Sequence, residues 1–294
     1  MNCKICGCSE FTVVYDDVIR NGSVGNYTND KVKLFQCKNC GAIFHLPYVS
    51  NDEYYRSEEY RTSVDGSSDA DTFQKNHDKE SLDKLEYTGT EIFRNKVVAD
   101  IGCGGGSFLD YVRGVAKEII AIEPSENFLH YLHNKGIVAF PYAKDAVIDF
   151  KEKVDIVTSF DVIEHVEDPV TFLRDSYTLL NEKGTAIIGT PTDAPFMRSL
   201  LGNVYEKKVL FSVQHLWYLS EESIKIAAKK AGFKKYEVKY FQRYGISNMM
   251  AWLRDKKPEG NIHFNGVSDT LNAVYKEELE RQKLGDYIVL YASK

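Results

Sequence analysis

The chain has no apolar run long enough to cross a bilayer, since a membrane-spanning helix needs about 20 consecutive apolar residues. The first residues, MNCKICGCSE, also lack the apolar core of a secretory signal. We therefore expect no membrane span and a cytoplasmic location, where cysteines stay reduced and disulfides are disfavoured.

The sequence also has fewer basic than acidic residues. The sequence has 37 Lys and Arg against 43 Asp and Glu, which gives a formal net charge of -6. Because nucleic acids select a basic surface, this balance disfavours a nucleic-acid partner. With 43% hydrophobic residues, 294 residues can bury a sizeable core in one large domain or two unequal ones.

Five of the six cysteines lie in residues 1–48, where CKIC and CKNC form two C-x-x-C pairs. Each pair can present two thiolates to one tetrahedral ion, so we predict a structural zinc site made by Cys3, Cys6, Cys37 and Cys40. Cys8 and His45 lie nearby and are alternative ligands, although they break the paired spacing. A redox role is disfavoured because no thioredoxin-like βαβ context surrounds either pair.

The rest of the chain divides into a polar segment and an alternating one. Residues 49–95 form either a plain linker or a cover for a ligand, with a loop at 66–68 and a helix at 71–87. Residues 96–191 alternate strands and helices, which predicts a parallel sheet with helices on both faces. The expected strands are 97–101, 118–122, 137–140, 154–159 and 185–189, and the expected helices are 106–115, 125–135 and 168–181.

The C-terminal part continues this pattern. A helix is expected near 220–231, a strand near 235–241 and a last strand at DYIVLYA. The insertions 192–218 and 243–284 are expected to face the substrate, which makes 96–294 a single α/β domain behind a zinc-binding module at 1–48.

The stretch VVADIGCGGGSF places a glycine loop directly after a predicted strand. In α/β sheets this is where ligands bind, but a dinucleotide fingerprint would have glycine where Ser107 stands. Asp100 at the strand end suits a ligand with a positive charge, and Glu123 at the end of the next strand suits a ribose diol. S-adenosylmethionine carries both groups, so it is the predicted cofactor.

Four segments, VVADIGCGGGSFL, AIEPS, VDIVTSFDVIEHVEDP and GTAIIGTPT, resemble in order the motifs of class I S-adenosylmethionine-dependent methyltransferases. The resemblance implies a Rossmann-like, seven-stranded methyltransferase sheet. It also implies that Asp100 and the glycine loop hold the methionyl part of the donor, Glu123 its ribose, and backbone near Ala143 its adenine. The full set of implied donor-binding residues is Asp100, Gly102, Cys103, Gly104, Glu123, Pro124, Ala143, Phe160 and Asp161.

The paired cysteines, together with HLWYLSEESI, AWLRDKKPEG and VYKEELERQKLGDYIVLYA, resemble bacterial methyltransferases of sugar and surface-glycan modification. This resemblance implies O-methylation of a sugar hydroxyl, with a small carbohydrate, nucleotide-linked or a glycan precursor, as the partner. Sugar C-methyltransferases carry a further domain after this point, which disfavours C-methylation.

Two histidines are candidates for the catalytic base. His215 follows the fifth strand among aromatic residues, where it either removes the acceptor proton or only holds the loop. His165 shares a helical face with Asp161 and Glu164, a pattern similar to one that can bind metal in ubiquinone O-methyltransferases. The alternative is that this motif only closes the donor pocket.

Three other functions remain open. An RNA methyltransferase predicts a basic groove, and a quinone or small aromatic O-methyltransferase predicts an apolar pocket. A zinc-stabilised scaffold that binds S-adenosylmethionine without turnover predicts no product. The basic residues of 225–257 form either a solvated helix face or a patch for a phosphate-bearing substrate.

Overall fold

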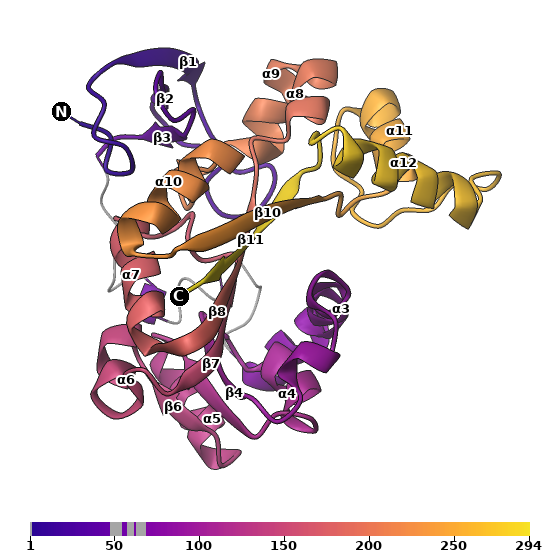
Figure 1. Ribbon diagram of the computed structural model, residues 1–294. Helices are drawn as coiled ribbons and strands as arrows, with labels where there is room; N and C mark the ends of the chain where they lie inside the picture. Colours follow the sequence, from indigo (N-terminus) through magenta and orange to yellow (C-terminus); the bar gives the residue numbers. More distant parts are fainter. Residues whose placement is uncertain (1, 48–54, 58–61, 63–68) are drawn as a thin grey trace. The chain divides into compact units, whose positions relative to one another are not determined.

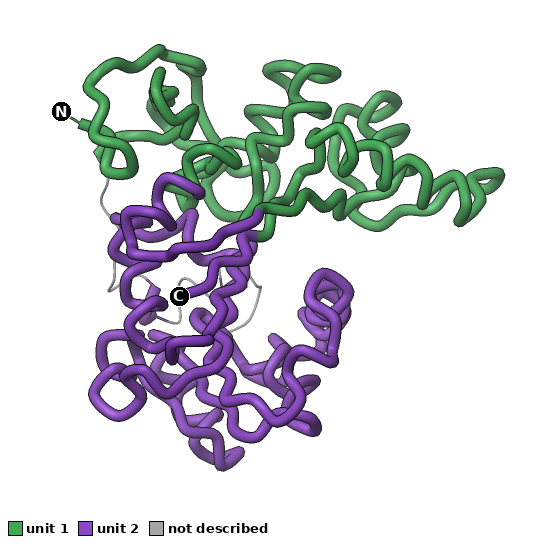
Figure 2. The backbone as a smooth tube through the Cα atoms, in the orientation of Figure 1, with its two compact units in different colours: residues 1–48, 190–224, 238–289 green, residues 49–189, 225–237, 290–294 purple. Residues whose placement is uncertain are grey.

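The computed structural model describes residues 2–47, 55–57, 62 and 69–294, so the loop predicted at 66–68 lies outside the described residues. The chain forms two compact units (Figure 2). Unit 1 contains residues 1–48, 190–224 and 238–289, and unit 2 contains residues 49–189, 225–237 and 290–294. The predicted scheme of three successive segments stays a prediction.

The predicted α/β fold is confirmed. A seven-stranded sheet has the order β10-β11-β8-β7-β4-β5-β6, and its last five strands pair in parallel. Strand β4 is buried along its whole length, as expected for a parallel sheet covered on both faces. The strands are β4 (Val97–Ile101), β5 (Glu118–Ile122), β6 (Val138–Phe140), β7 (Val154–Phe160), β8 (Leu180–Pro191), β10 (Lys235–Phe241) and β11 (Tyr287–Ser293).

Helices of unit 2 cover both faces of this sheet (Figure 1). Helices α3, α4 and α5 pack together on one side, and α6 and α7 pack together on the other. The α-helices of unit 2 are α3 (Ala70–Thr88), α4 (Ser107–Arg113), α5 (Glu126–Asn134), α6 (Ala143–Phe150) and α7 (Pro169–Leu179). A short 3-10 helix, η1 (Glu91–Phe93), follows α3. Helix α10 (Glu221–Ala231) contributes residues to both units.

Two predicted elements differ from the structure. The helix predicted to reach residue 181 ends at Leu179, because Leu180 already pairs with Val154 in the sheet. Strand β8 therefore starts five residues earlier than predicted, and its register with β7 shifts between the pairs Val154–Leu180 and Ile156–Thr185. A Cβ atom on Gly184 would lie 2.8 Å from the Leu180 side chain, so this irregular part of the strand favours glycine. Helix α6 was not predicted.

Unit 1 contains a second sheet of four strands in the order β1-β2-β3-β9. Its first three strands come from residues 11–45, and β9 comes from residues 217–218, so the predicted zinc-binding segment is completed by a distant part of the chain. The elements of this unit are β1 (Phe11–Asp17), β2 (Val32–Cys37), β3 (Ile43–His45), β9 (Trp217–Tyr218), α8 (Pro195–Leu201), α9 (Asn203–Tyr205), the π-helix η2 (Glu206–Leu210), α11 (Ile246–Asp255) and α12 (Asp269–Arg281).

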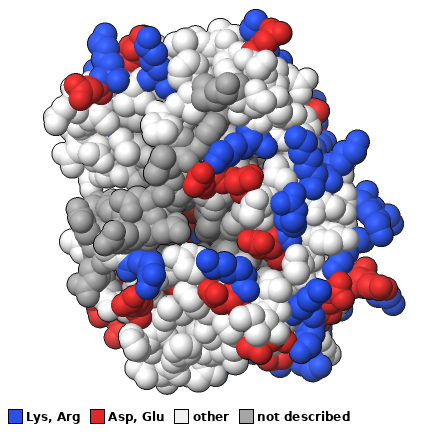
Figure 3. Space-filling view, turned by 90° about the vertical axis from the view of Figure 1, so that its left-hand side faces the viewer, with Lys and Arg blue, Asp and Glu red and all other residues white. Residues whose placement is uncertain are grey.

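The basic residues of 225–257 are partly neutralised by neighbouring acids. Arg254 pairs with Asp255 at 2.6 Å, and Lys257 pairs with Glu259 at 2.7 Å. On the face drawn in Figure 3, basic and acidic side chains are interspersed. The two ion pairs favour a solvated surface at residues 254–259. Among the described residues, no helix is long and apolar enough to cross a membrane.

Candidate active site

The glycine loop follows β4 in the left-handed backbone region. The φ angles of Gly102, Gly104 and Gly106 are 77°, 54° and 84°, values that glycine adopts without steric cost. Close packing adds a second requirement, because a Cβ atom on Gly102 would lie 2.2 Å from the Val162 side chain. The loop thus exposes backbone that a ligand can approach closely.

Glu123 is fully buried directly after β5 and is tied to this loop. Its carboxylate accepts hydrogen bonds from the backbone N–H groups of Gly104 and Ser125, each at 2.9 Å. A carboxylate can accept several hydrogen bonds at once, so a side chain of this type can hold backbone N–H groups and contact a ribose diol. The side chain predicted to bind ribose therefore also fixes the shape of the glycine loop.

Asp100 lies beneath the loop and is 4% exposed. Its Oδ1 accepts a hydrogen bond of 2.7 Å from the Thr158 hydroxyl. Burial raises the pKa of Asp100 to about 7, although the Thr158 hydroxyl and the Lys84 ammonium act in the opposite direction. The carboxyl group is therefore poised to ionise when a positive charge arrives.

Helix α3 places a row of side chains against the glycine loop. Phe73, His77, Ser81 and Lys84 recur at helical spacing and line a small cavity together with Asp100 and Gly102 and with Cys103 and Phe160. The Lys84 ammonium lies 3.7 Å from the Asp161 carboxylate and 5.4 Å from the centre of the Phe160 ring. These four helix residues were not identified from the sequence, because three of them are polar and no apolar stripe marks this face of the helix.

A larger cavity of about 500 Å³ opens from the same loop. It is lined by Gly102, by Glu123 and Pro124 after β5, by Ala143 at the start of α6, and by Asp161 and His165 after β7. With the smaller cavity, it brings together every predicted donor-binding residue except Gly104, which lies within the same loop. Their roles as donor ligands stay predictions.

His165 lines the larger cavity, and both it and Glu164 belong to a group of described residues that could hold a metal ion, whereas Asp161 does not. Its Nδ1 lies 3.3 Å from the Tyr55 hydroxyl, and its Nε2 lies 4.0 Å from the Glu164 carboxylate. Asp161 instead pairs with Lys84. Among the described residues, Asp161, Glu164 and His165 do not form a three-ligand group.

We expect substitution of Gly104 by alanine to weaken donor binding at least about tenfold. A Cβ atom there would lie 2.4 Å from the Phe73 ring, which is held between His77 and Phe128. A left-handed non-glycine residue costs about 1–3 kcal/mol before any clash is counted. Calorimetric titration with S-adenosylhomocysteine measures the effect. Gly136→Ala is the matched control, because its φ is 70° but a Cβ there contacts nothing within 4 Å.

The four predicted zinc ligands converge in unit 1. The Sγ atoms of Cys3 and Cys40 lie 3.8 Å apart, those of Cys6 and Cys37 lie 3.4 Å apart, and all four lie within 4.8 Å of one another. Ligand sulfurs about 2.3 Å from a tetrahedral zinc ion would be roughly 3.8 Å apart. Neither Cys8 nor His45 belongs to this group of described residues.

Both cysteine pairs use the same backbone turn. The N–H groups of Gly7 and Gly41 donate to the carbonyl groups of Cys3 and Cys37 at 2.8 and 2.9 Å, and their φ angles are 88° and 73°. The motif is therefore C-x-x-C-G, because glycine relieves the left-handed strain that follows each pair. That glycine was a sequence signal we did not use.

The segment that carries His215 is bound to the second cysteine turn. The Ser220 hydroxyl donates to the Cys40 carbonyl at 2.9 Å, and β9 pairs with β3. The Tyr218 hydroxyl accepts the Ser212 N–H at 2.8 Å and closes the loop around His215. His215 lies in unit 1 and His165 in unit 2.

The comparisons with known proteins agree on the fold. A family profile described as a methyltransferase domain matches residues 73–238. The chain is 27% identical over 131 residues to the ubiquinone biosynthesis O-methyltransferase of Pelagibacter ubique, covering 42% of this chain and 55% of that protein. It is 26% identical over 194 residues to the tRNA U34 carboxymethyltransferase of Pseudoalteromonas translucida, covering 62% and 58% of the two chains.

Among solved structures, a S-adenosylmethionine-dependent methyltransferase from Archaeoglobus fulgidus aligns with a TM-score of 0.50 and 18% identity, covering 80% of this chain and 98% of that one. At this identity the likeness concerns the fold alone. Because the family profile spans more than half of the residues, the chain belongs to the methyltransferase domain family. The predicted class of S-adenosylmethionine-dependent methyltransferases is thus confirmed at the level of family and fold.

Proposed function

We propose that this protein transfers the methyl group of S-adenosylmethionine to a hydroxyl group of a small-molecule acceptor. The observation that carries the proposal is the glycine loop between two buried acids, Asp100 below it and Glu123 beside it. A cavity of about 500 Å³ beside that loop is of the size that binds small molecules and cofactors.

The donor would use both cavities of unit 2. Its ribose would lie against Glu123 and its adenine near Ala143, where the larger cavity is lined by backbone and side chains of α6. Its methionyl part would lie in the smaller cavity, where Asp100 faces the ammonium group. Lys84 lines the same cavity but already pairs with Glu80 at 2.8 Å and Asp161 at 3.7 Å, so it would contact the donor carboxylate only by sharing its charge. The sulfonium already activates the methyl group, so the enzyme's task is to align the acceptor, exclude water and accept a proton.

Glu123→Gln tests this placement. The amide would keep the side-chain volume. Its NH₂ group would, however, face one of the two backbone N–H groups that now donate to the Glu123 carboxylate. Hydrogen bonds to charged groups contribute about 1.5–3 kcal/mol, so affinity for S-adenosylhomocysteine should fall roughly 10- to 150-fold. Titration calorimetry measures this, with Glu118→Gln at the exposed start of the same strand as control. Unchanged affinity would place the ribose elsewhere.

Donor affinity should depend on pH through Asp100. Its pKa of about 7 means that the carboxyl is mostly protonated at pH 6 and mostly ionised at pH 8. If the ionised form holds the donor ammonium, affinity rises about tenfold across this interval. Asp100→Asn keeps the Oδ1 acceptor for Thr158 but cannot ionise. The ratio of wild-type to variant affinity, which cancels the ligand's own titration, should therefore rise with pH, and a flat ratio would contradict the assignment.

Two acceptor classes are supported by different observations. The names of the curated relatives, ubiquinone O-methyltransferase and tRNA carboxymethyltransferase, favour the alternatives more than the predicted sugar hydroxyl. The chain spans only 55% of the length of the first of these relatives, so the acceptor of that relative does not identify the acceptor of this protein. A radiolabelled methyl donor incubated with catechol, quinol and nucleotide-sugar panels distinguishes these acceptor classes.

The cysteine group of unit 1 is proposed to hold a structural zinc ion. The sulfur separations of 3.4 and 3.8 Å support a tetrahedral tetrathiolate site, which leaves no open position for catalysis. The ion would add free energy of folding to the first three strands and to β9, beyond what their buried core of Leu34, Phe44 and Trp217 supplies.

A further inference from the structure

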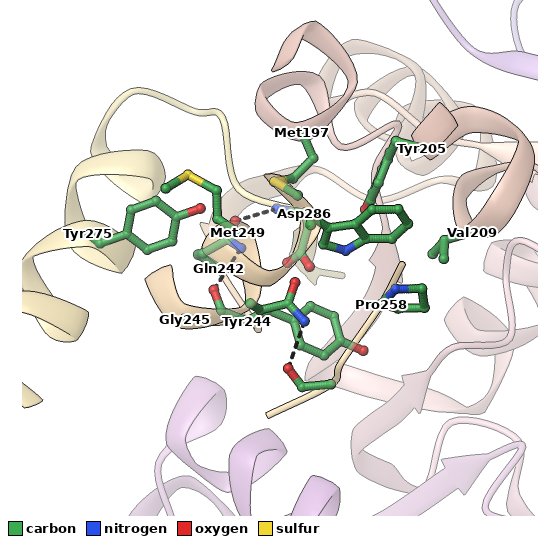
Figure 4. A pocket seen from close by; sticks show the side chains of 13 residues that line it. Met197, Tyr205, Val209, Gln242, Tyr244, Gly245, Met249, Pro258, Tyr275 and Asp286 are labelled. Atoms are coloured by element: carbon green, nitrogen blue, oxygen red, sulfur yellow. Dashed lines mark hydrogen bonds between the residues drawn. The ribbon is translucent and has the colours of Figure 1, made fainter. Parts of the chain in front are cut away.

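A separate cavity lies wholly within unit 1 and shares no residue with the two donor cavities (Figure 4). Its lining comes from both insertions that were predicted to face a substrate, 192–218 and 243–284. Gln242 and Asp286 complete it at the end of β10 and the beginning of β11. The backbone N–H of Thr192, just after β8, donates to the Asp286 carbonyl at 3.0 Å. The cavity therefore lies where β8 and β10 end, and α/β sheets bind ligands at the carboxyl ends of strands.

Aromatic rings form the walls of this cavity. The rings of Tyr205 and Trp252 lie 5.2 Å apart in an edge-to-face arrangement, and both side chains are buried. Tyr244 and Tyr275 also line the cavity. In Figure 4 the rings of Tyr205 and Tyr275 lie on either side of Asp286. Such walls offer flat apolar faces with polar edges, which suit a ring-shaped ligand that carries polar groups.

Asp286 supplies the charged group of the cavity and is only 5% exposed. Its Oδ1 accepts a hydrogen bond of 2.9 Å from the Arg243 backbone N–H, and its Oδ2 lies 3.5 Å from the Arg243 guanidinium. Gly285 permits this position, since a Cβ atom there would lie 2.5 Å from the Phe241 carbonyl oxygen. Because Arg243 offsets the carboxylate charge, the cavity favours a neutral ligand over a cation.

Two phenol groups add hydrogen-bond donors. The Tyr275 hydroxyl is buried and has no hydrogen-bond partner among the residues that the structure describes. Burial and the charge of Asp286 both raise the pKa of Tyr275, and burial followed by Asp286 does the same for Tyr205. Both phenols therefore stay protonated at neutral pH. Each can donate a hydrogen bond to a ligand whose own hydroxyl groups donate to Asp286.

The size of the cavity selects among ligands. About 70 Å³ is open to the centres of water molecules. One water needs about 10–15 Å³ by this measure and occupies about 30 Å³ of liquid, so the cavity holds roughly five waters or about 150 Å³ of ligand. That volume fits one six-membered ring with its hydroxyl groups and is too small for a nucleotide or a ring with a long alkyl tail.

We propose that this cavity binds a single neutral, hydroxyl-bearing saturated ring, a pyranose unit, with Asp286 accepting from its hydroxyls, Tyr275 donating to it and Trp252 covering its apolar face. The binding of this ring to unit 1 does not rest on the proposed function. Because His215 does not line the cavity, the proposal assigns a binding site in the two insertions and not the position of a reacting hydroxyl.

Saturation-transfer NMR on the full chain tests the proposal with three kinds of probe. The methyl glycosides of glucose, galactose and mannose represent the neutral saturated ring, choline represents a cation, and catechol represents a planar aromatic acceptor. We expect signal from at least one glycoside and competition between that glycoside and its free sugar. Binding of choline or catechol with no glycoside signal would overturn the assignment.

Two substitutions locate the binding. Tyr275→Phe removes one neutral hydrogen bond and should weaken the glycoside roughly 2- to 12-fold, with the ring retained. Asp286→Asn should weaken it at least about tenfold, because a bond to a charged acceptor is lost. Tyr27→Phe, in the same unit but outside the cavity, is the matched control and should leave affinity unchanged. Equal affinity in Tyr275→Phe and wild type would place the glycoside elsewhere.

Titration of the same samples with S-adenosylhomocysteine separates the two claims. Donor binding without glycoside binding would reject this cavity and keep the methyltransferase proposal. Glycoside binding without donor binding would reject the proposed function and keep the cavity. Both proposals are supported if the wild type binds the glycoside and S-adenosylhomocysteine. In that case, Tyr275→Phe and Asp286→Asn should bind the glycoside more weakly and S-adenosylhomocysteine with unchanged affinity.

Discussion

Removal of metal with a strong chelator should lower the melting temperature of unit 1 by roughly 10 °C or more. Four sulfurs held within 4.8 Å of one another fit a single ion, and three of the four cysteines are almost fully buried. Structural zinc sites bind with apparent free energies of about 10–16 kcal/mol, which is available for folding. Even a net loss of about 4 kcal/mol corresponds to roughly 8–16 °C for a domain of this size.

Cys40→Ser should reproduce the effect of chelation, with Cys8→Ser as the matched control. Cys8 lies outside the sulfur group, and its thiol contacts the backbone of Glu10 instead. Hydrogen exchange should accelerate at residues 32–45 and also at 217–220, because β3 pairs with β9 and the Ser220 hydroxyl binds the Cys40 carbonyl. Metal analysis that finds less than one zinc per chain, or equal melting of both variants, would refute the site.

The parallel half of the fold was predictable from the sequence because its signals are local. Each buried strand is a short apolar run with a polar or glycine end, and strands β4, β5 and β7 begin at the predicted residues. Helix α6 was missed because Ala143–Phe150 follows Pro141 and Tyr142 without a capping side chain, so no start signal marks it. The early start of β8 depends on its pairing with Val154, which no local pattern reveals.

The division of the chain into two units could not be predicted from local sequence patterns. Strand β9 has only two residues, Trp217 and Tyr218, and it is a strand because Ile43 and Phe44 pair with it. Likewise, Asp286 becomes part of a cavity because Gly285 allows the chain to approach Phe241. Both features arise from contacts between segments more than forty residues apart, which one sequence does not report.

The sequence singled out Asp100, Glu123 and the glycine loop because their chemistry is specific and their spacing follows the strands. The structure brings them to the same cavities, and their roles as donor ligands stay predictions. Lys84 and Phe73 were missed because they lie on a helix before the first strand of the sheet, where no apolar stripe marks a buried face. Their contact with the loop appears only in three dimensions.

His215→Ala should lower the rate of methyl transfer by about 10²–10⁴-fold and leave donor affinity nearly unchanged. General bases typically contribute this factor, because the acceptor hydroxyl must lose its proton as the methyl group arrives. His215 lies on the segment closed by the Ser212 to Tyr218 hydrogen bond, so its ring is held by a fixed backbone. The substitution removes the ring without touching that bond, which makes a folding defect separable by measuring the melting temperature.

The pH profile decides whether His215 acts as a base or only holds its loop. In the wild type, the rate should rise with pH as the imidazole loses its proton, and His215→Ala should lose that dependence. His215→Gln provides the second measurement, since it restores hydrogen bonding but cannot take a proton, so a purely structural role would be rescued and a base would not. The same profile should be measured for His165→Ala, because His165 is the other candidate base and lines the larger cavity beside Tyr55 and Glu164. Full activity in His215→Ala together with loss of the pH dependence in His165→Ala would transfer the role of base to His165.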